Sequence, residues 1–369
     1  MRTDLNVFKK PISPKNFALA IFVLLVLVFS FHTTVWHLAT KNILAPQPSL
    51  HIGDLARLSY SLTSVHHKVD SNITLPKQHI KAHKWKGQKV DILTIGDSFS
   101  NGTAGGNNPF YQDYIASMTN TKVLNISTKR DLIESVISLS NNGLLSKMSP
   151  KVIILESVER YVIDRFDIDI NWDANYSKND FLSDLSKTEK KPQAASIINN
   201  GNYKYLINPL KYEYSSKPIN ISNVYKVPLS QELFSVEDPS HLLFYSEELD
   251  KILKATPQAI KKANKNLNDL AVFLQQKGVR LVFLPIVDKS NLYASYIVSN
   301  PFVQSALFEQ LRPLPKQYYF VDTKAILQKA LPKQLDLYYA DDTHWSYHGS
   351  KITMQSIPFK ELLKTTNER

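Results

Sequence analysis

The sequence predicts an α/β fold with a mainly parallel sheet. Short apolar runs with the length of buried strands occupy five places, at residues 90–95, 122–126, 151–155, 280–286 and 318–321. Stretches with helical periodicity lie between and after them, at residues 110–118, 131–139, 258–277, 301–311, 323–330 and 346–364. Strands that alternate with helices are typical of β-α-β units, whose strands pair in parallel. Active groups of such sheets gather at the carboxyl ends of the strands.

The N-terminal region predicts one transmembrane anchor at residues 16–37. No Lys, Arg, Asp or Glu occurs between residues 16 and 40, and about 20 apolar residues suffice to cross a bilayer core. Four basic residues precede the span against one acid, so the positive-inside rule keeps residues 1–15 in the cytoplasm. A cleaved signal peptide is the alternative. The apolar run is long for a signal peptide and no small-residue cleavage site follows it, so we expect an uncleaved anchor.

The region after the anchor divides into a linker and a catalytic domain. Residues 38–85 contain scattered prolines and little periodicity, which predicts a stalk with one short helix near residues 55–62. Residues 86–369 form the domain, which an irregular insertion rich in Asn, Lys, Ser and Tyr interrupts at about residues 164–249. The insertion's tyrosines either stack on sugars or anchor it to the core, and we favour the core for all four, Tyr203, Tyr205, Tyr212 and Tyr214.

Composition excludes several classes of function. The chain has no cysteine, so disulfides, thiol nucleophiles and cysteine-ligated zinc are excluded. The net charge is +11, but the basic residues are scattered and form no stripe interleaved with aromatic residues, so we do not expect nucleic-acid binding. His66 and His67 have no Asp, Glu or His partners at ligand spacing. We interpret them as solvated linker residues and expect neither a metal site nor a cofactor.

Two short motifs, about 250 residues apart, predict covalent acyl transfer. Ser98 ends a Gly-Asp-Ser sequence that directly follows the first predicted strand of the domain, and His344 ends an Asp-Asp-Thr-His sequence near the C-terminus. A serine hydroxyl is a weak nucleophile until an imidazole takes its proton and a carboxylate orients that imidazole. We therefore expect Ser98 as the nucleophile, His344 as the general base, and either Asp341 or Asp342 as the acid.

These motifs resemble those of the SGNH (GDSL-like) hydrolase superfamily. The Gly-Asp-Ser sequence is similar to its first signature block, and Asp-Thr-His-Trp at 342–345 is similar to a motif of the AlgX/AlgJ branch, the alginate O-acetyltransferase-like proteins. Residues 152–161 and 281–293 are similar to two further strands of that branch. The resemblance covers about residue 86 to the end and implies the three-layer SGNH-type fold. Known members of the branch carry the histidine motif before the serine, whereas here Ser98 comes first.

The resemblance also implies roles for individual residues. The branch motif selects Asp342 as the triad acid, whereas many SGNH enzymes would use Asp341, and we choose Asp342. The Ser98 backbone N–H is one oxyanion donor, and the remaining candidates for donors or substrate contacts are Asn101, Arg130 and Arg160. For Arg160 we favour instead a structural ion pair with Glu156.

The implied function is an O-acetyltransferase anchored in the bacterial inner membrane, with its catalytic domain in the periplasm or otherwise outside the cytoplasm. It would move acetyl through Ser98 onto an exported polysaccharide, and the resemblance implies a membrane-bound acyltransferase of the MBOAT kind as the acetyl donor. An esterase or deacetylase with the same triad is the first alternative. A non-catalytic polysaccharide-binding or assembly factor is the second.

Overall fold

The core of the protein is a six-stranded parallel sheet. The computed structural model describes residues 13–44, 52–60, 71, 73–101, 108–183, 196–215 and 218–364. All neighbouring strands of the sheet pair in parallel, in the order β1 (Ile80–Lys81), β3 (Val123–Ser127), β2 (Ile92–Gly96), β4 (Val152–Val158), β8 (Arg280–Ile286) and β9 (Tyr319–Phe320). The predicted fold class, an α/β domain with a mainly parallel sheet, is confirmed.

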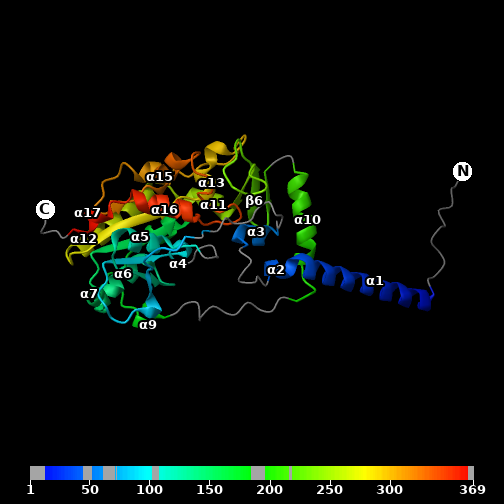
Figure 1. The fold of residues 1–369 in the computed structure, drawn as a ribbon, viewed down its shortest axis with the longest axis horizontal. Coiled ribbons are helices and arrows are strands. Elements are labelled where there is room, and N and C mark those ends of the chain that lie inside the picture. The colour runs from blue at the N-terminus through cyan, green and yellow to red at the C-terminus, as the bar shows by residue number, and fades with distance from the viewer. Residues whose placement is uncertain are drawn as a thin grey trace.

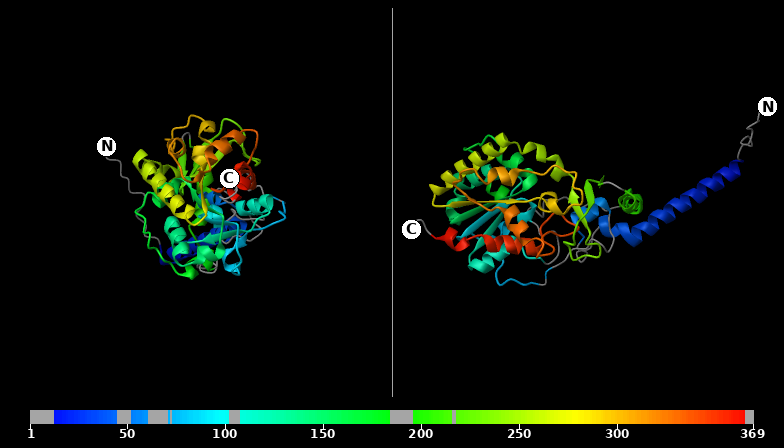
Figure 2. Two further views of the ribbon diagram at one scale, coloured as in Figure 1. Left: turned by 90° about the vertical axis from the view of Figure 1, so that its left-hand side faces the viewer. Right: turned by 90° about the horizontal axis from the view of Figure 1, so that it is seen from above.

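Helices cover both faces of this sheet and complete three layers (Figures 1 and 2). One face carries α6 (Leu132–Asn141), α7 (Leu144–Met148) and α12 (Pro257–Gln275). The other carries α5 (Tyr111–Thr119), α15 (Thr323–Ala330) and α16 (Tyr347–Ser356). Successive strand residues point to opposite faces, so Ile154 of β4 packs in one core and Leu155 in the other. A strand buried on both faces therefore reads as a continuous apolar run.

Two predicted helices are shorter in the structure than the sequence indicated. The pattern at 346–364 is divided into α16 and α17 (Phe359–Leu363), with Pro358 between them. Proline lacks an N–H and disfavours helical backbone in the residue before it, so the helix ends there. The pattern at 301–311 forms only α14 (Leu307–Leu311).

The predicted insertion is more regular than the sequence suggested. It contains α8 (Val162–Phe166), α9 (Lys178–Leu182), α10 (Gly201–Glu213) and α11 (Glu247–Asp250), together with a second sheet. That sheet is antiparallel, with the order β5 (Ile219–Ile221), β6 (Val224–Pro228) and β7 (His241–Tyr245). The expectation of an irregular segment is therefore wrong for these residues. Each strand is too short for its alternation to stand out until its partners are known. Phe244 of β7 is fully buried in the domain core.

The segment predicted as a stalk is partly built into the domain. β1 adds an edge strand to the main sheet through its pairing with β3. The short helix α3 (Asp54–Ser59) buries Leu55 against Val224 and Leu243 of the second sheet. A free stalk is therefore not what the described residues form. His66 and His67 lie outside the described residues.

One long apolar helix precedes the domain. α1 (Pro14–Val35) begins with Pro14 after the capping residue Ser13, and it continues through a π-helical turn (Trp36–Thr40). By length and composition it can cross a membrane. Its large side chains from Phe17 to Phe29 are exposed, and it projects away from the domain (Figure 1).

Candidate active site

Ser98 begins the helix that directly follows the central strand β2. The strand ends at Gly96, and α4 (Ser98–Asn101) starts two residues later. Asp97 shapes this turn, because one carboxylate oxygen accepts the Phe99 N–H at 3.1 Å and the other accepts the Val158 N–H at 2.9 Å. A side chain at Gly96 would lie 2.2 Å from Glu156 Oε2, so only glycine fits.

The buried carboxyl group of Glu156 supports the turn from below. Its Oε2 atom accepts the Asp97 N–H at 2.9 Å and the Ser100 hydroxyl at 2.7 Å. Burial, followed by the neighbouring negative charge of Asp97, raises the pKa of Glu156 well above its usual value. The pKa of Asp97 is lowered although burial opposes this, because Arg165 lies 2.5 Å from its carboxylate. Burial thus disfavours the charged form of Glu156, whereas Arg165 stabilises the charge of Asp97.

Ser98, His344 and Asp342 form one hydrogen-bonded chain. His344 Nε2 lies 2.8 Å from Ser98 Oγ, and His344 Nδ1 lies 2.6 Å from Asp342 Oδ1. The same Oδ1 atom accepts the His344 backbone N–H at 3.0 Å. The side chains of His344 and Asp342 are only 15% and 3% exposed. This geometry activates a serine: the nucleophile is hydrogen-bonded to a base, and a third group orients that base.

The electrostatic surroundings of His344 favour its protonated form. Burial by itself would lower the pKa of the imidazole, but the adjacent Asp342 carboxylate and the charge of Asp54 outweigh it and raise the pKa of His344. A carboxylate at Nδ1 holds a proton on that nitrogen and leaves Nε2 free to accept one from Ser98. The arrangement can therefore accept a proton and stabilise the imidazolium that results.

The start of α3 clamps the loop that carries the histidine. Asp342 Oδ2 accepts the Asp54 N–H at 3.1 Å, and Asp341 Oδ2 accepts the Gly53 N–H at 2.8 Å. In return, the Asp54 carboxylate accepts the Thr343 N–H at 2.8 Å and the Thr343 hydroxyl at 2.5 Å. The two adjacent aspartates thus face different partners, and Asp342 is the one that meets His344. Sequence reasoning missed Asp54, because a Gly-Asp pair before a short helix carries no signal that links it to a motif 288 residues away.

A buried lysine holds the same loop from its other side. Lys289 is fully buried at the start of α13 (Lys289–Leu292), just after β8. Its ammonium donates to the carbonyl oxygens of Tyr339 at 2.8 Å, Ala340 at 3.2 Å and Asp342 at 3.0 Å. Burial lowers the pKa of Lys289 to about 8. The lysine belonged to a stretch that resembles the acetyltransferase branch, but only the folded chain reveals what it holds.

Asn101 is tied into the scaffold beside Ser98. Its amide donates to the Gly96 carbonyl at 2.9 Å, and its oxygen accepts the amide of Asn125 at 3.0 Å and the hydroxyl of Ser127 at 2.5 Å. These bonds fasten α4 to the end of β3. The Ser98 backbone N–H donates to no atom within the described part of the chain, so it is available to an oxyanion.

The two candidate arginines engage other partners. Arg130 lies 3.6 Å from Asp180 and over the ring of Tyr176. Arg160 forms a buried ion pair with Asp288, so its expected pairing with Glu156 is wrong. Glu156 lies within the strand β4, which ends at Val158, and Arg160 lies in the 3-10 turn Glu159–Tyr161. The two residues therefore do not share the continuous helix that would place side chains four positions apart on one face.

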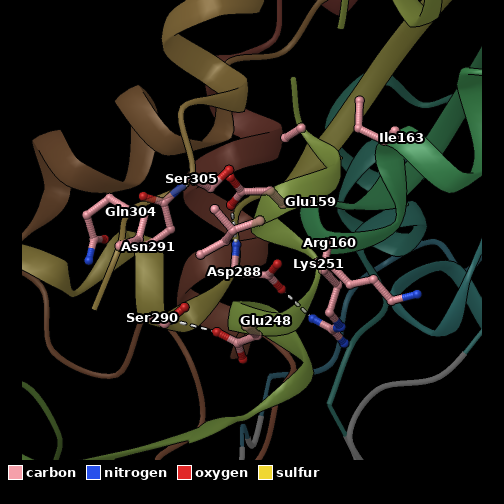
Figure 3. Close-up of a pocket in the computed structure, with 13 residues that line it drawn as sticks. Glu159, Arg160, Ile163, Glu248, Lys251, Asp288, Ser290, Asn291, Gln304 and Ser305 are labelled. Carbon is pink, nitrogen blue, oxygen red and sulfur yellow. Dashed lines mark hydrogen bonds and ion pairs between the residues drawn. The ribbon is translucent and has the colours of Figure 1, made fainter. Parts of the chain in front are cut away.

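Arg160 belongs to a buried charged cluster at the carboxyl ends of β4 and β8. Figure 3 shows Arg160 directed at Asp288, and Glu248 directed at Ser290, whose N–H it accepts at 2.8 Å. Glu159 accepts the Asp288 N–H at 2.9 Å. Burial raises the pKa of Glu159 to about 7. Asp288 and Ser290 of this cluster directly precede and follow Lys289 in the chain, so the cluster holds the segment that positions the lysine.

A small pocket opens beside His344 and leads into a surface groove. The pocket has a volume of about 290 Å³ including its mouth, and aromatic side chains dominate its wall, namely Phe99, Phe110, Tyr111, Tyr339, Trp345 and Tyr347. The groove, of about 940 Å³ including its mouth, shares Asn108, Pro109 and Phe110 with the pocket. It adds polar side chains, among them Gln78, His79, Lys81 and Lys84.

The acidic and imidazole groups of the site are close enough to ligate one ion. Candidate ligand atoms of Asp54, Asp342 and His344 all lie within 4.8 Å of one another. However, Nδ1 of His344 and Oδ1 of Asp342 already face each other at 2.6 Å, and Thr343 occupies both oxygens of Asp54. The donor set therefore fits a hydrogen-bonded triad with a supporting carboxylate better than a metal centre.

The C-terminal third of the chain is similar to a known protein family. Residues 241–363 match a protein family described as SGNH hydrolase-like domain, acetyltransferase AlgX. The match contains Lys289, Asp342 and His344, while Ser98 lies outside it. The comparison with curated proteins produced no match. Over residues 241–363 the chain is thus similar to the SGNH hydrolase-like domain of acetyltransferase AlgX, the resemblance that the motifs predicted.

Proposed function

We propose that this protein is a membrane-anchored O-acetyltransferase of the bacterial cell envelope. It transfers acetyl through Ser98 to hydroxyl groups of an exported polysaccharide. The observation that carries the proposal is the hydrogen-bonded chain from Ser98 through His344 to Asp342, with distances of 2.8 and 2.6 Å. The similarity to an acetyltransferase domain favours acetyl as the transferred group.

The reaction proceeds in two halves. Ser98 Oγ attacks the acetyl carbonyl while His344 Nε2 takes the hydroxyl proton, and His344 then gives that proton to the departing donor group as its bond to the acyl carbon breaks. In the second half, an acceptor hydroxyl attacks acetyl-Ser98 and loses its proton to His344, which returns it to Ser98 Oγ. Asp342 stabilises the imidazolium in both halves, and the Ser98 N–H stabilises the oxyanion.

The surroundings of Ser98 suit a small acyl group and a large acceptor. The aromatic pocket beside His344 is small, about 290 Å³ including its mouth, which favours a short acyl group over a long acyl chain. The adjoining groove offers the Phe110 ring, with the Lys81 ammonium 5.4 Å from its centre, and several polar side chains. An apolar ring with surrounding hydrogen-bond donors is the combination that binds sugars.

The proposal includes a location and an acetyl donor. With α1 in the inner membrane and its N-terminus in the cytoplasm, the domain lies outside the cytoplasm. The resemblance to the AlgX/AlgJ branch implies that a membrane-bound acyltransferase of the MBOAT kind supplies the acetyl group there. The length and composition of α1 support such an anchor.

One observation favours hydrolysis as a second candidate function. Ser98 is exposed at the mouth of the site, so water can reach an acetyl-Ser98 intermediate. An esterase or deacetylase would use the same triad with water as the acceptor. A non-catalytic binding role fits less well, because a binding surface has no need for a serine held against a buried His–Asp pair.

Replacing Ser98 by alanine tests the mechanism. Ser98→Ala should abolish turnover of a chromogenic acetyl ester and prevent acetylation of the protein, which mass spectrometry of the intact chain detects. Ser230→Ala, at an exposed serine after β6, is the matched control and should behave like the wild type. Near-normal turnover in a folded Ser98→Ala protein would refute the mechanism. Adding glycan acceptors and measuring acetyl-glycan against free acetate separates transfer from hydrolysis.

A further inference from the structure

The helix α10 carries an exposed apolar stripe along its whole length. The stripe residues are spaced at i, i+3, i+4, i+7 and i+11 and are between 45% and 84% exposed: Tyr203, Leu206, Ile207, Leu210 and Tyr214. At about 100° per residue they occupy roughly a third of the helix circumference. The opposite face packs on the protein through Gly201, Asn208 and Tyr212. Soluble surfaces rarely leave so continuous a stripe uncovered.

α10 begins on the domain-side end of the apolar helix α1. The Asn202 amide lies 2.7 Å from His32 Nδ1 and 3.3 Å from the His32 carbonyl, and Asn202 also bonds Thr40. The next ring, Tyr203, stacks on Phe31 with 5.0 Å between centres. Figure 1 shows α10 crossing the end of α1 steeply, and the right-hand view of Figure 2 shows α10 nearly end-on.

The point where α10 meets α1 lies about one bilayer thickness from the cytoplasmic end of α1. Lys15 and His32 are 17 residues apart on α1, which corresponds to about 26 Å of helix at about 1.5 Å per residue. The hydrocarbon core of a bilayer is about 30 Å thick. If Lys15 marks the cytoplasmic boundary, His32 and the start of α10 therefore lie at the opposite boundary.

We propose that α10 lies flat in the outer interface of the bilayer that α1 crosses, with its apolar stripe turned into the lipid. The proposal rests on the anchored topology of the proposed function. Lipid is the occupant because the stripe begins where Tyr203 stacks on Phe31 of the apolar helix α1. Leu38 and Ile198, which follow α1 and precede α10 in the chain, are also 78% and 54% exposed. Lys204 and Lys211 flank the stripe, and tyrosines stand at both of its ends. Basic flanks and interfacial tyrosines are typical of helices that lie on membranes.

This placement ties the active site to the membrane surface. The Asn208 amide donates to the Ser59 carbonyl at 2.9 Å, and Lys204 lies over the Tyr60 ring at 5.5 Å. Both contacts join α10 to the end of α3, whose first residue, Asp54, clamps Thr343 beside the triad. Contacts therefore run from the membrane interface through α10 and α3 to the loop that carries His344. The site is held at a set height above the bilayer, where a membrane-embedded donor would present acetyl.

The absence of cysteine makes the proposal directly testable, because single cysteines can be introduced and labelled. We would reconstitute the full chain in liposomes with an environment-sensitive fluorophore at Leu206→Cys or Leu210→Cys. Val272→Cys, on the exposed surface of α12, is the matched control, and Val23→Cys in α1 reports the anchor. Lipids with a spin label near the headgroup should quench at least half of the stripe emission, because interfacial helices lie about 5–10 Å deep. The Val272 probe should keep its emission.

The outcomes distinguish a failure of the interfacial placement from a failure of the membrane anchor or of the proposed function. Unquenched probes at Leu206 and Leu210, with a Val23 probe that is quenched by lipids spin-labelled in the acyl chain, would overturn the interfacial placement while leaving the anchor intact. A blue-shifted stripe probe that lipid fails to quench, and whose shift disappears when the protein is diluted in the bilayer, would show that a second copy covers the stripe and would also overturn it. The measurement needs no turnover, so the Ser98→Ala protein should give the same quenching whether or not the proposed function is correct.

Discussion

Replacing Asp342 by asparagine tests the geometry of the triad, and Asp341→Asn is its matched control. Asp342 Oδ1 lies 2.6 Å from His344 Nδ1 and accepts the His344 N–H at 3.0 Å, while Oδ2 accepts the Asp54 N–H at 3.1 Å. Asp341 instead accepts the N–H of Gly53 at 2.8 Å. The two neighbours have the same chemistry and differ in what they face.

The size of the effect follows from these contacts. An asparagine at 342 must turn its NH₂ group either toward His344 or toward the Asp54 N–H, so neither orientation keeps all three bonds. The first orientation also stabilises the wrong imidazole tautomer, and both lose the charge that stabilises the imidazolium. We expect a loss on the order of 10⁴ in turnover, which is about 5.5 kcal/mol. In Asp341→Asn the amide oxygen can still accept the Gly53 N–H, so we expect a loss of about tenfold or less, about 1.4 kcal/mol.

Initial rates on one chromogenic acetyl ester decide between the two aspartates. Both variants and the wild type should be measured at the same pH, above the acid limb of the wild-type profile. A thermal melt of each protein establishes that it is folded. The reasoning fails if Asp341→Asn is the more damaging change, or if Asp342→Asn retains a tenth or more of the wild-type rate.

Three further predictions concern the groups around His344. Although burial opposes it, Asp342 raises the pKa of His344. Because only the neutral imidazole accepts a proton, the acid limb of the kcat/KM profile should have its midpoint above about pH 6.5. A lower midpoint would contradict this prediction. Asp54→Asn removes a second charge that raises this pKa and should move the limb to lower pH in the same profile. Lys289 loses its proton near its lowered pKa of about 8, so the wild-type rate should fall above that pH. Lys289→Met should lower the rate throughout and abolish the alkaline limb, and an unchanged limb would exclude this role.

Features encoded by local pattern could be predicted from the sequence. β8 has the predicted bounds, because a strand buried on both faces is a continuous apolar run. The turn at Ser98 was predictable because Gly-Asp-Ser directly follows such a run, and the histidine motif because its residues are adjacent. α15 also has its predicted bounds, since its amphipathic periodicity is uninterrupted.

Features that depend on distant partners could not be predicted. The short strands β5, β6 and β7 carry too few residues for a periodic signal, and they are stabilised only by one another and by the core. Arg160 pairs with a residue 128 positions away. The sequence suggested only nearby Glu156. The four tyrosines of the insertion illustrate the same limit: Tyr212 is buried as expected, whereas Tyr203 and Tyr214 are exposed on α10.

By itself, the sequence determined the fold class, the apolar helix and the identity of the residues that could perform acyl transfer, because periodicity, turn chemistry and motif spacing are local properties. The tertiary structure decided which aspartate meets His344, and it brought Asp54 and Lys289 to the loop that carries them. It also set α10 across the end of α1 with its apolar stripe exposed. These arrangements depend on packing between segments up to 289 residues apart, and the direction in which a side chain points there is fixed by its neighbours in space and not by its neighbours in the chain.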